Sequence, residues 1–263
     1  MSPHPLLVFD FDGVLMDGMP EYWWAARRAA QSLHPDLLLP QEAPDAFARL
    51  RPLIHKGWEM VLMAAELGRA DFDLAGTCAA YPTALQAALN RWDLTPTGLQ
   101  DALEAVRRHA IAADLAGWLA LHRFYPGVPE RLRRLGQEGS DWSVLTTKGG
   151  AFAAQLLAAA DLRPRAVLGH EQGSKPEVLQ RLLSDAQEIW FIEDRRPTLE
   201  LVRATPGLQS VRCYLVTWGY LAPGDGDQLP AGIRGLDPEA FLDRKSTRLN
   251  SSHSSVSRMP SSA

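Results

Sequence analysis

The sequence predicts an α/β protein in which a doubly wound parallel sheet carries an inserted, all-helical segment. Short apolar runs alternate with helical patterns over residues 123–216, and this alternation is typical of a parallel sheet covered on both faces. Residues 6–9 form an apolar run that is too short for a helix and has no polar interruption, as expected of a buried central strand. Residues 19–122, by contrast, show only helical periodicity.

Two carboxylates and a glycine follow the first apolar run. Asp10 and Asp12 are two residues apart and would project to the same side, and Gly13 lets the chain turn sharply. Ligands of open α/β sheets bind beyond the carboxyl ends of the strands, so both acids fall where chemistry usually takes place. The alternative is an ordinary Asp-Gly turn after a core strand, and the short motif alone does not decide between the two interpretations.

Apolar residues at helical spacing predict four helices in the segment 19–122. The predicted helices cover residues 21–33, 52–67, 83–92 and 97–122. Thr97 and Gln100 have the pattern of a capping box for the last helix, along which Leu99, Leu103 and Val106 form an apolar stripe. The segment is therefore predicted to be a helical bundle.

The strand-helix alternation begins after a turn rich in Pro and Gly at residues 125–129, which breaks the last helix of the bundle. Ser174 and Glu177 form a second capping-box pattern, with Pro176 at the first helical position, so Lys175 is predicted at a helix N-terminus. The predicted strands lie at residues 142–147, 166–169, 189–193 and 211–216, and the helices between and around them at residues 130–137, 150–160, 176–184 and 197–204.

Composition and charge narrow the class of protein. A chain of 263 residues with 46% hydrophobic content can bury a large core, and its net charge of −4, with Arg pairs scattered between acids, argues against a nucleic-acid partner. No apolar stretch approaches about 20 residues and no basic leader precedes the first strand, so we expect a cytoplasmic protein without a membrane partner. Cys78 and Cys213 fit no metal-ligand spacing and indicate a reducing compartment. The oligomeric state is not indicated.

The segment 244–263 differs from the rest of the chain, because it is basic, rich in Ser and almost without apolar residues. Such a segment cannot bury enough surface to fold, and its abrupt start indicates a non-native tail. The alternative is a flexible basic tail that binds an acidic partner.

Taken in chain order, four stretches resemble the four motifs of the haloacid dehalogenase superfamily, most of whose members are magnesium-dependent phosphohydrolases. The stretches are residues 6–17, 141–150, 174–177 and 188–195, and the match covers roughly residues 5–18 and 123–220. The resemblance implies a Rossmann-like core at residues 1–18 and 123–243, with a helical cap at residues 19–122 that closes over the active site.

The resemblance also implies catalytic roles. Asp10 would be the nucleophile that forms an aspartyl-phosphate, and Asp12 the general acid and base. Dehalogenating relatives lack the second Asp, so its presence favours phosphoryl transfer. Thr146 would donate a hydrogen bond to a phosphoryl oxygen, together with amides at the start of the helix at Gly149 and Gly150, and Lys175 would neutralise charge. Taken singly, Thr146 would be a buried capping residue and Lys175 a solvated surface residue.

A magnesium site is implied at the same place, because Mg²⁺ prefers oxygen ligands in octahedral geometry. Asp10, the backbone carbonyl of Asp12, and Asp194 would supply the ligands, and Glu193 is either a further ligand or an outer-sphere hydrogen-bond partner. The alternative is an exposed loop in which Arg195 forms a salt bridge with the two acids. Arg195 and Arg196 depart from the family pattern, which more often has small residues there.

Residues that would contact the substrate come from two regions. Near the core motifs they are Gly13, Thr147 and Lys148, and Thr-Thr-Lys is similar to the Thr-Asn-Lys of phosphoglycolate phosphatases. In the helical segment, Arg51, His55 and Lys56 cluster at the start of a predicted amphipathic helix and could contact an anionic substrate, although such a trio is more often a solvated face. His109 and His122 have no partner acids at ligand spacing and are interpreted as structural.

The sequence thus predicts an Mg²⁺-dependent phosphatase that hydrolyses a small phosphorylated metabolite, phosphoglycolate-like, through an aspartyl-phosphate. One alternative is a phosphomutase on the same scaffold. Another is a non-catalytic module that binds a phosphometabolite, but the joint presence of Asp10, Asp12, Thr146, Lys175 and Asp194 argues against it.

Overall fold

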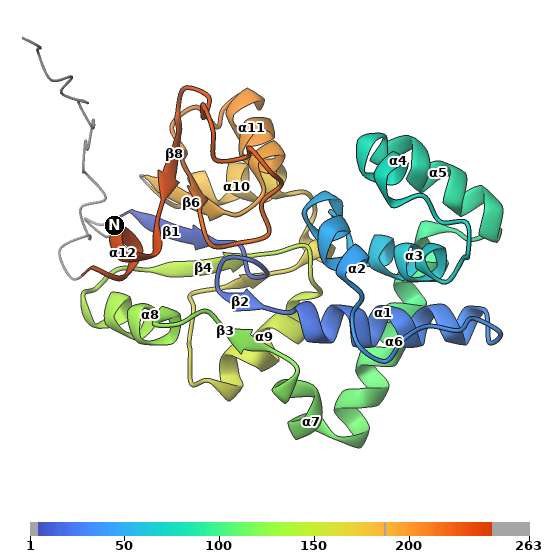
Figure 1. Cartoon of the computed structure of the whole chain (residues 1–263). Coiled ribbons are helices and arrows are strands. Elements are labelled where there is room, and N and C mark those ends of the chain that lie inside the picture. Colours follow the sequence, from blue (N-terminus) through green and yellow to red (C-terminus); the bar gives the residue numbers. More distant parts are fainter. Residues whose placement is uncertain (1–4, 187, 244–263) are drawn as a thin grey trace, which may run out of the picture.

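The computed structural model describes residues 5–186 and 188–243, in which six parallel strands form one sheet with the order β5-β4-β1-β6-β7-β8 (Figure 1). The predicted doubly wound parallel sheet is thereby confirmed. The segment 244–263 lies outside the described residues, so the expectation of a non-native tail stays a prediction. The strands are β1 (Leu6–Phe9), β4 (Trp142–Leu145), β5 (Val167–Leu168), β6 (Ile189–Glu193), β7 (Arg212–Val216) and β8 (Ile233–Leu236).

The register of the sheet brings the ends of its three central strands level. Phe9 at the end of β1 pairs with Val144 of β4 on one side and with Ile192 of β6 on the other. The next amide, that of Asp10, still donates a hydrogen bond to the carbonyl of Ile192 at 2.8 Å. Residues that follow β1, β4 and β6 therefore meet at one edge of the sheet.

Alternate residues of the strands pack into two apolar layers, one on each face, because side chains along a strand point to opposite faces. Leu7 and Phe9 pack with helices α8 (Val128–Gln137), α9 (Gly150–Ala159) and α12 (Pro238–Leu242). Leu6 and Val8 pack with helices α10 (Lys175–Leu183) and α11 (Arg196–Ala204) on the opposite face (Figure 1). This double cover explains why β1 has no polar residue.

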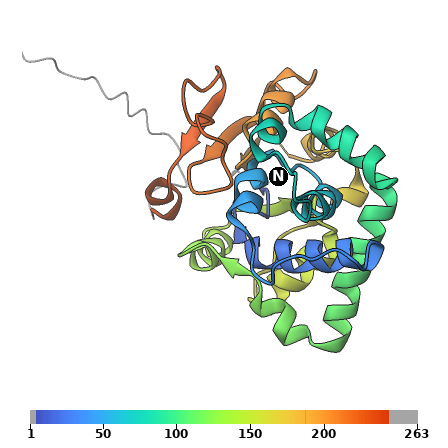
Figure 2. The same cartoon turned by 45° about the vertical axis from the view of Figure 1, so that its right-hand side comes forward.

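An all-helical cap is inserted between β2 (Met16–Asp17) and β3 (Arg123–Phe124), which pair with each other in an antiparallel ribbon. Most of its helices pack beside the carboxyl end of the sheet around a separate apolar core that includes Trp23, Phe47 and Leu62 (Figure 2), whereas Trp118 of the last helix packs with the core of the sheet. The elements are α1 (Met19–Leu33), α2 (Asp45–Leu50), the 3-10 turn η1 (Arg51–Leu53), α3 (Gly57–Leu67), α4 (Leu74–Ala79), α5 (Tyr81–Trp92), α6 (Pro96–Ala113) and α7 (Leu115–Ala120).

Two predicted helices of the cap differ from the structure. The capping box of Thr97 and Gln100 is wrong, because Thr95 caps α6 by accepting a hydrogen bond from the amide of Gly98 at 3.1 Å, with Pro96 at the first helical position. That helix also ends at Ala113, and Asp114 caps the separate helix α7. The predicted helix at 52–67 is split into η1 and α3 by extended backbone at Ile54 and Lys56.

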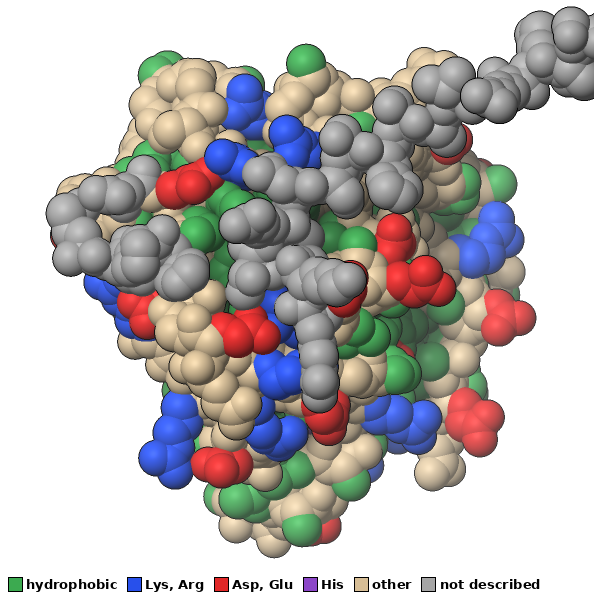
Figure 3. Space-filling view, turned by 90° about the vertical axis from the view of Figure 1, so that its left-hand side faces the viewer, with side chains coloured by type: hydrophobic (Ala, Val, Ile, Leu, Met, Phe, Trp, Pro, Cys, Tyr) green, Lys and Arg blue, Asp and Glu red, His purple; other side chains and the backbone are tan. Residues whose placement is uncertain are grey.

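One face of the molecule can be compared with the absence of a basic stripe in the sequence. On the face seen in Figure 3, basic and acidic side chains are interspersed and do not gather by sign. No helix within the described ranges is both long enough and apolar enough to cross a membrane.

Candidate active site

Asp10 lies at the edge where β1, β4 and β6 end, and it is almost fully buried. Lys175, the first residue of α10, reaches it from the next layer, with 2.9 Å between the lysine Nζ and the Asp10 Oδ1. The capping box of Ser174 and Glu177 is present as predicted, although Pro176 occupies the second helical position. This cap fixes the start of α10 and with it the position of Lys175.

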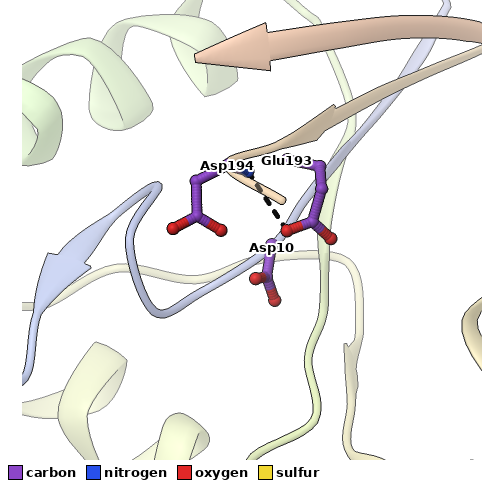
Figure 4. A group of neighbouring side chains, drawn as sticks. All are labelled: Asp10, Glu193 and Asp194. Atoms are coloured by element: carbon purple, nitrogen blue, oxygen red, sulfur yellow. Dashed lines mark hydrogen bonds between the residues drawn. The ribbon is translucent and has the colours of Figure 1, made fainter. Parts of the chain in front are cut away.

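Three carboxylates, those of Asp10, Glu193 and Asp194, converge at this point (Figure 4). One oxygen from each lies within 4.8 Å of the others, and all three residues are buried. Lys175 neutralises only one of the three charges, so the cluster carries a net charge of −2 when all its groups are ionised. A divalent cation would fit this site, because it prefers hard oxygen ligands and would compensate the net negative charge.

The hydrogen bonds of Glu193 bear on its role in such a site. Its Oε2 is 2.6 Å from the Nζ of Lys175, and its Oε1 accepts the amides of Asp194 and Arg195, both at 3.1 Å. Both oxygens are therefore engaged, which favours the outer-sphere role over direct ligation. The expected alternative, an exposed loop with Arg195 as a salt-bridge partner, is wrong, since Glu193 is 1% exposed and Asp194 5%.

The local electrostatics raise the pKa of Asp10 to about 7, mainly through burial and then through the charge of Glu193, with Lys175 opposing both. Burial also raises the pKa values of Glu193 and Asp194. Lys175 is held charged, because Asp10 and Glu193 outweigh the effect of its own burial on its pKa. A cation bound among the carboxylates would favour their ionised forms.

We expect the metal-free protein to lose stability as the pH rises from about 4 to about 7, relative to Asp10→Asn. The pKa of Asp10 is about 7 in the fold against 3.8 for the free side chain, so the folded state retains a proton that the unfolded state has lost. Thermal melts in chelator should show Asp10→Asn gaining more over the wild type at pH 8 than at pH 5. Parallel curves for the two proteins would contradict this electrostatic account.

Asp12 contacts a second cation instead of Lys175. The Nζ of Lys148 is 3.5 Å from the Asp12 Oδ1 and 3.8 Å from the Glu21 Oε2. Glu21 in turn accepts two hydrogen bonds of 2.7 Å from Arg107, and both of these side chains are buried. Burial would raise the pKa of Glu21, but Arg107 and Lys148 outweigh it and lower the pKa to about 2. Lys148 is thus held between Asp12 and a fixed ion pair of the cap.

Sequence reasoning missed Glu21 and Arg107. A signal for Arg107 was present, because it continues the four-residue spacing of Leu99 and Leu103 and so places a charge on the buried stripe of α6. His122 lies beside the pair, with its Nε2 3.9 Å from the Glu21 Oε2. Burial and the charge of Lys148 lower its pKa to about 4, so it is neutral near pH 7.

Thr146 follows β4, and its hydroxyl oxygen accepts the amide of Lys148 at 3.1 Å. Accepting this bond leaves the hydroxyl hydrogen of Thr146 able to donate. One expected donor is not available, because the amide of Gly150 at the start of α9 donates to the carboxylate of Glu171 at 3.2 Å. The prediction that the amides of this helix start bind phosphate therefore needs correction at Gly150.

The acid cluster requires a glycine at position 13. Its φ of +87° is in the left-handed region, and a Cβ placed on it would lie 1.9 Å from the Oδ2 of Asp194. Any larger residue would collide with a candidate metal ligand. The glycine therefore lets the loop after β1 pass directly over Asp194.

Arg51 lies in the turn η1, half-buried between the cap and the core, and not at the start of a helix as predicted. Its guanidinium carbon is 4.2 Å from the ring centroid of Tyr220 and 5.0 Å from that of Tyr22. Its Nε is buried and has no hydrogen-bond partner within the described part of the chain. The stacked rings hold the guanidinium in place while leaving donors of Arg51 for a ligand.

A small cavity of about 30 Å³ lies between Arg51 and Asp12. Thr147 and Lys148 line it from the core, and His55 and Lys56 line it from the cap. Burial, and then the charges of Arg195 and Lys175, lower the pKa of His55 to about 4, so His55 is neutral near pH 7. The predicted cationic trio is therefore reduced to Arg51 and Lys56 in the folded chain, with Lys148 added from the core.

The two arginines that follow the acid cluster have different surroundings. Arg196 binds Glu200 at 2.8 Å and the carbonyl of Asp227 at 2.9 Å, which ties α11 to a surface loop. Arg195 is the N-cap residue of α11 and lines a larger cleft between the core and the cap. Arg195 is therefore placed beside the site and Arg196 away from it.

Solved structures share the fold of this chain, although no family model matches it. A haloacid dehalogenase-like family hydrolase from Streptococcus pneumoniae superposes with a TM-score of 0.55 and 16% identity, over 92% of this chain and 98% of that one. A protein from Haemophilus somnus described as a predicted phosphoglycolate phosphatase gives 0.58 and 19%, over 92% and 97%. The chain thus has the fold of the haloacid dehalogenase-like hydrolases.

The chain is also similar in sequence to a curated protein. The chain is 24% identical over 276 residues to a phosphoglycolate phosphatase of Pseudomonas putida, which covers 92% of this chain and 87% of that protein. The four motifs, the fold and this relative together support a phosphatase of the haloacid dehalogenase superfamily. The superfamily resemblance noted in the sequence is therefore confirmed.

Proposed function

We propose that the protein is an Mg²⁺-dependent phosphatase that hydrolyses a small phosphorylated metabolite with an anionic leaving portion, as phosphoglycolate has. The single observation that supports it most is the buried cluster of Asp10, Glu193 and Asp194, compensated only in part by Lys175, with Asp12 two residues from Asp10. A screen of phosphorylated metabolites with and without Mg²⁺ tests the proposal. If no phosphate monoester is hydrolysed in the presence of Mg²⁺, the proposal fails.

In the proposed mechanism, a carboxylate oxygen of Asp10 attacks phosphorus while the bond from phosphorus to the leaving oxygen breaks. Asp12 gives its proton to the leaving oxygen, and the alcohol departs. Asp12 then takes a proton from a water molecule, whose oxygen attacks the phosphorus of the aspartyl-phosphate and frees Asp10 and inorganic phosphate. Lys175 and the hydroxyl of Thr146 hold the phosphoryl oxygens throughout. Asp10, Asp194 and the carbonyl of Asp12 would hold Mg²⁺, which would supply charge neutralisation.

Asp12 protonates the leaving oxygen in this mechanism, so the leaving portion must begin on the Asp12 side of the phosphoryl group. The cavity of about 30 Å³ lies on that side, and the cations Arg51, Lys56 and Lys148 line it. A carboxylate there would meet these three positive charges and that of Arg107, which also lines the cavity but is paired with Glu21, with Asp12 as the opposing acid. We also propose that the chain divides into a core, residues 1–18 and 123–243, and a cap, residues 19–122. Both parts line the cavity, so both would contact the substrate.

We expect Arg51→Ala to lower kcat/KM for 2-phosphoglycolate about tenfold or more and to change that for phenyl phosphate little. A charge-assisted hydrogen bond to a carboxylate contributes on the order of 1.5 to 3 kcal/mol, and phenyl phosphate has no carboxylate. Steady-state kinetics on both substrates provide the comparison, with Arg49→Ala, an exposed arginine of the neighbouring helix α2, as the matched control. Equal losses on both substrates would instead show a general structural effect.

We expect Asp194→Ala to raise the Mg²⁺ concentration needed for half-maximal activity, by about tenfold or more, because one carboxylate ligand is removed. Activity titrated with Mg²⁺ after chelation measures the effect. Asp225→Ala is a suitable control, since this acid lies in a surface loop. Full activity of the wild type in chelator would rule out the metal assignment altogether.

A further inference from the structure

We propose that the preferred substrate is larger than phosphoglycolate and that its leaving alcohol carries an apolar ring or chain, which lies in the cleft between the cap and the loops of the core. This inference rests on the proposed phosphatase function and specifies its substrate class. The cleft has a volume of about 570 Å³, against about 30 Å³ for the cavity beside Asp12. Ligand-binding sites in proteins have volumes of roughly 300 to 1,000 Å³. A cleft of this size can therefore hold a ligand much larger than a two-carbon acid.

The cleft is continuous with the catalytic groups. Thr146 and Lys175, which would hold the phosphoryl oxygens, form part of its wall. It shares a further wall with the small cavity, made of His55, Lys56, Gly57, Gln100 and Thr147. A leaving portion that starts at Asp12 and outgrows the small cavity therefore passes along this wall into the cleft.

Beyond the shared residues, the wall of the cleft includes a group of apolar side chains. Trp58 contributes from the cap and Pro197 and Leu201 from α11, with Pro96 at the start of α6. Leu201 is one of few large apolar side chains exposed in the described ranges, at 56% exposure, although it lies on an otherwise amphipathic helix. Burying such a side chain against an apolar part of a ligand is favourable, because apolar surface is removed from water.

The charges around the cleft set a second condition on the ligand. The charged side chains of its wall include Lys56, Lys175 and Arg195, and no carboxylate of the described residues lines it. The ligand is accordingly an anion near the ester and apolar at its far end. A phosphate monoester of an alcohol that bears a ring or an alkyl chain has this polarity, whereas phosphoglycolate provides only its anionic half.

The test compares 2-naphthyl phosphate with phenyl phosphate, which share the aryl ester and differ in the apolar surface beyond it. We expect kcat/KM to be about tenfold higher for the naphthyl ester, mainly through a lower KM. Leu201→Glu should abolish this preference, because it puts a charge where the second ring would lie. Leu201 is exposed on its helix, so the substitution is compatible with folding.

Leu115→Glu is the matched control, since Leu115 is also exposed on a helix but lies outside the cleft. It should leave the naphthyl-to-phenyl ratio unchanged, and Trp58→Ala should lower that ratio from the cap side. If the wild type hydrolyses phosphoglycolate and phenyl phosphate but the ratio is near one and insensitive to Leu201→Glu, this inference is overturned and the proposed function stands. If no phosphate ester is hydrolysed, both are overturned.

Discussion

Asp10→Asn is expected to reduce kcat by roughly 10,000-fold or more on every phosphate ester, because the amide keeps the shape of the side chain but cannot form the acyl phosphate. The loss should be in kcat and should not depend on the leaving group. Asp10 is buried at the end of the central strand with its amide already bonded to Ile192, so the backbone around it should not move. Circular dichroism and thermal melts accompany the kinetics.

The matched control for Asp10→Asn is Asp17→Asn, a change of the same kind in the ribbon that leads to the cap. Asp17 accepts a hydrogen bond of 2.6 Å from the hydroxyl of Tyr220 and lies outside the acid cluster. We expect it to retain most of the wild-type kcat. Turnover by folded Asp10→Asn at a rate comparable with the wild type would remove Asp10 from the mechanism.

Lys175→Met is expected to have the second largest effect, and it should act on stability as well as on turnover. The lysine contacts Asp10 at 2.9 Å and Glu193 at 2.6 Å, and all three side chains are buried. Removing one partner of a buried ion pair costs about 3 to 5 kcal/mol, because the remaining charge is left uncompensated. The melting temperature in chelator should fall clearly, and kcat should be lost.

A second substitution separates charge from packing in this cluster. The double variant Lys175→Met with Glu193→Gln removes one charge of each sign, so it should recover part of the lost melting temperature without recovering activity. Added Mg²⁺ should also raise the melting temperature of Lys175→Met, because a cation replaces the missing positive charge. If neither change raises the melting temperature, the destabilisation is a packing effect and the charge argument is wrong.

The sequence was sufficient for the parts of the fold that depend on local patterns. β1 is an uninterrupted apolar run, β6 is apolar up to its last residue, and the structure gives β6 the predicted bounds of residues 189–193. Strand β8 was not predicted, because its sequence, Ile-Arg-Gly-Leu, buries only its two ends and lies at the edge of the sheet. A four-residue edge strand with a glycine has too weak a pattern to distinguish from a loop.

The residues of the site were likewise predictable only where a local pattern marks them. The acids at the ends of β1 and β6 were predictable because parallel strands end at a common edge. The surroundings of Arg51 could not be predicted, because Tyr220 is distant in the sequence. Its ring comes to lie on the guanidinium of Arg51 only when the chain folds. Likewise, Glu21 and Arg107 are 86 residues apart, and their pairing depends on how α1 packs against α6. Contacts between residues far apart in the chain depend on tertiary packing, so no local pattern identifies which residues will pair.

The ribbon of β2 and β3 has a consequence for how this chain can change. Asp17 pairs with Arg123, so the two strands through which the chain leaves and re-enters the core lie side by side. The ends of the inserted segment are already held together, and closing a different segment across them would cost little additional loop entropy. The ribbon is thus a natural graft point, where a foreign helical module could be exchanged for the native one while the catalytic acids stay in place.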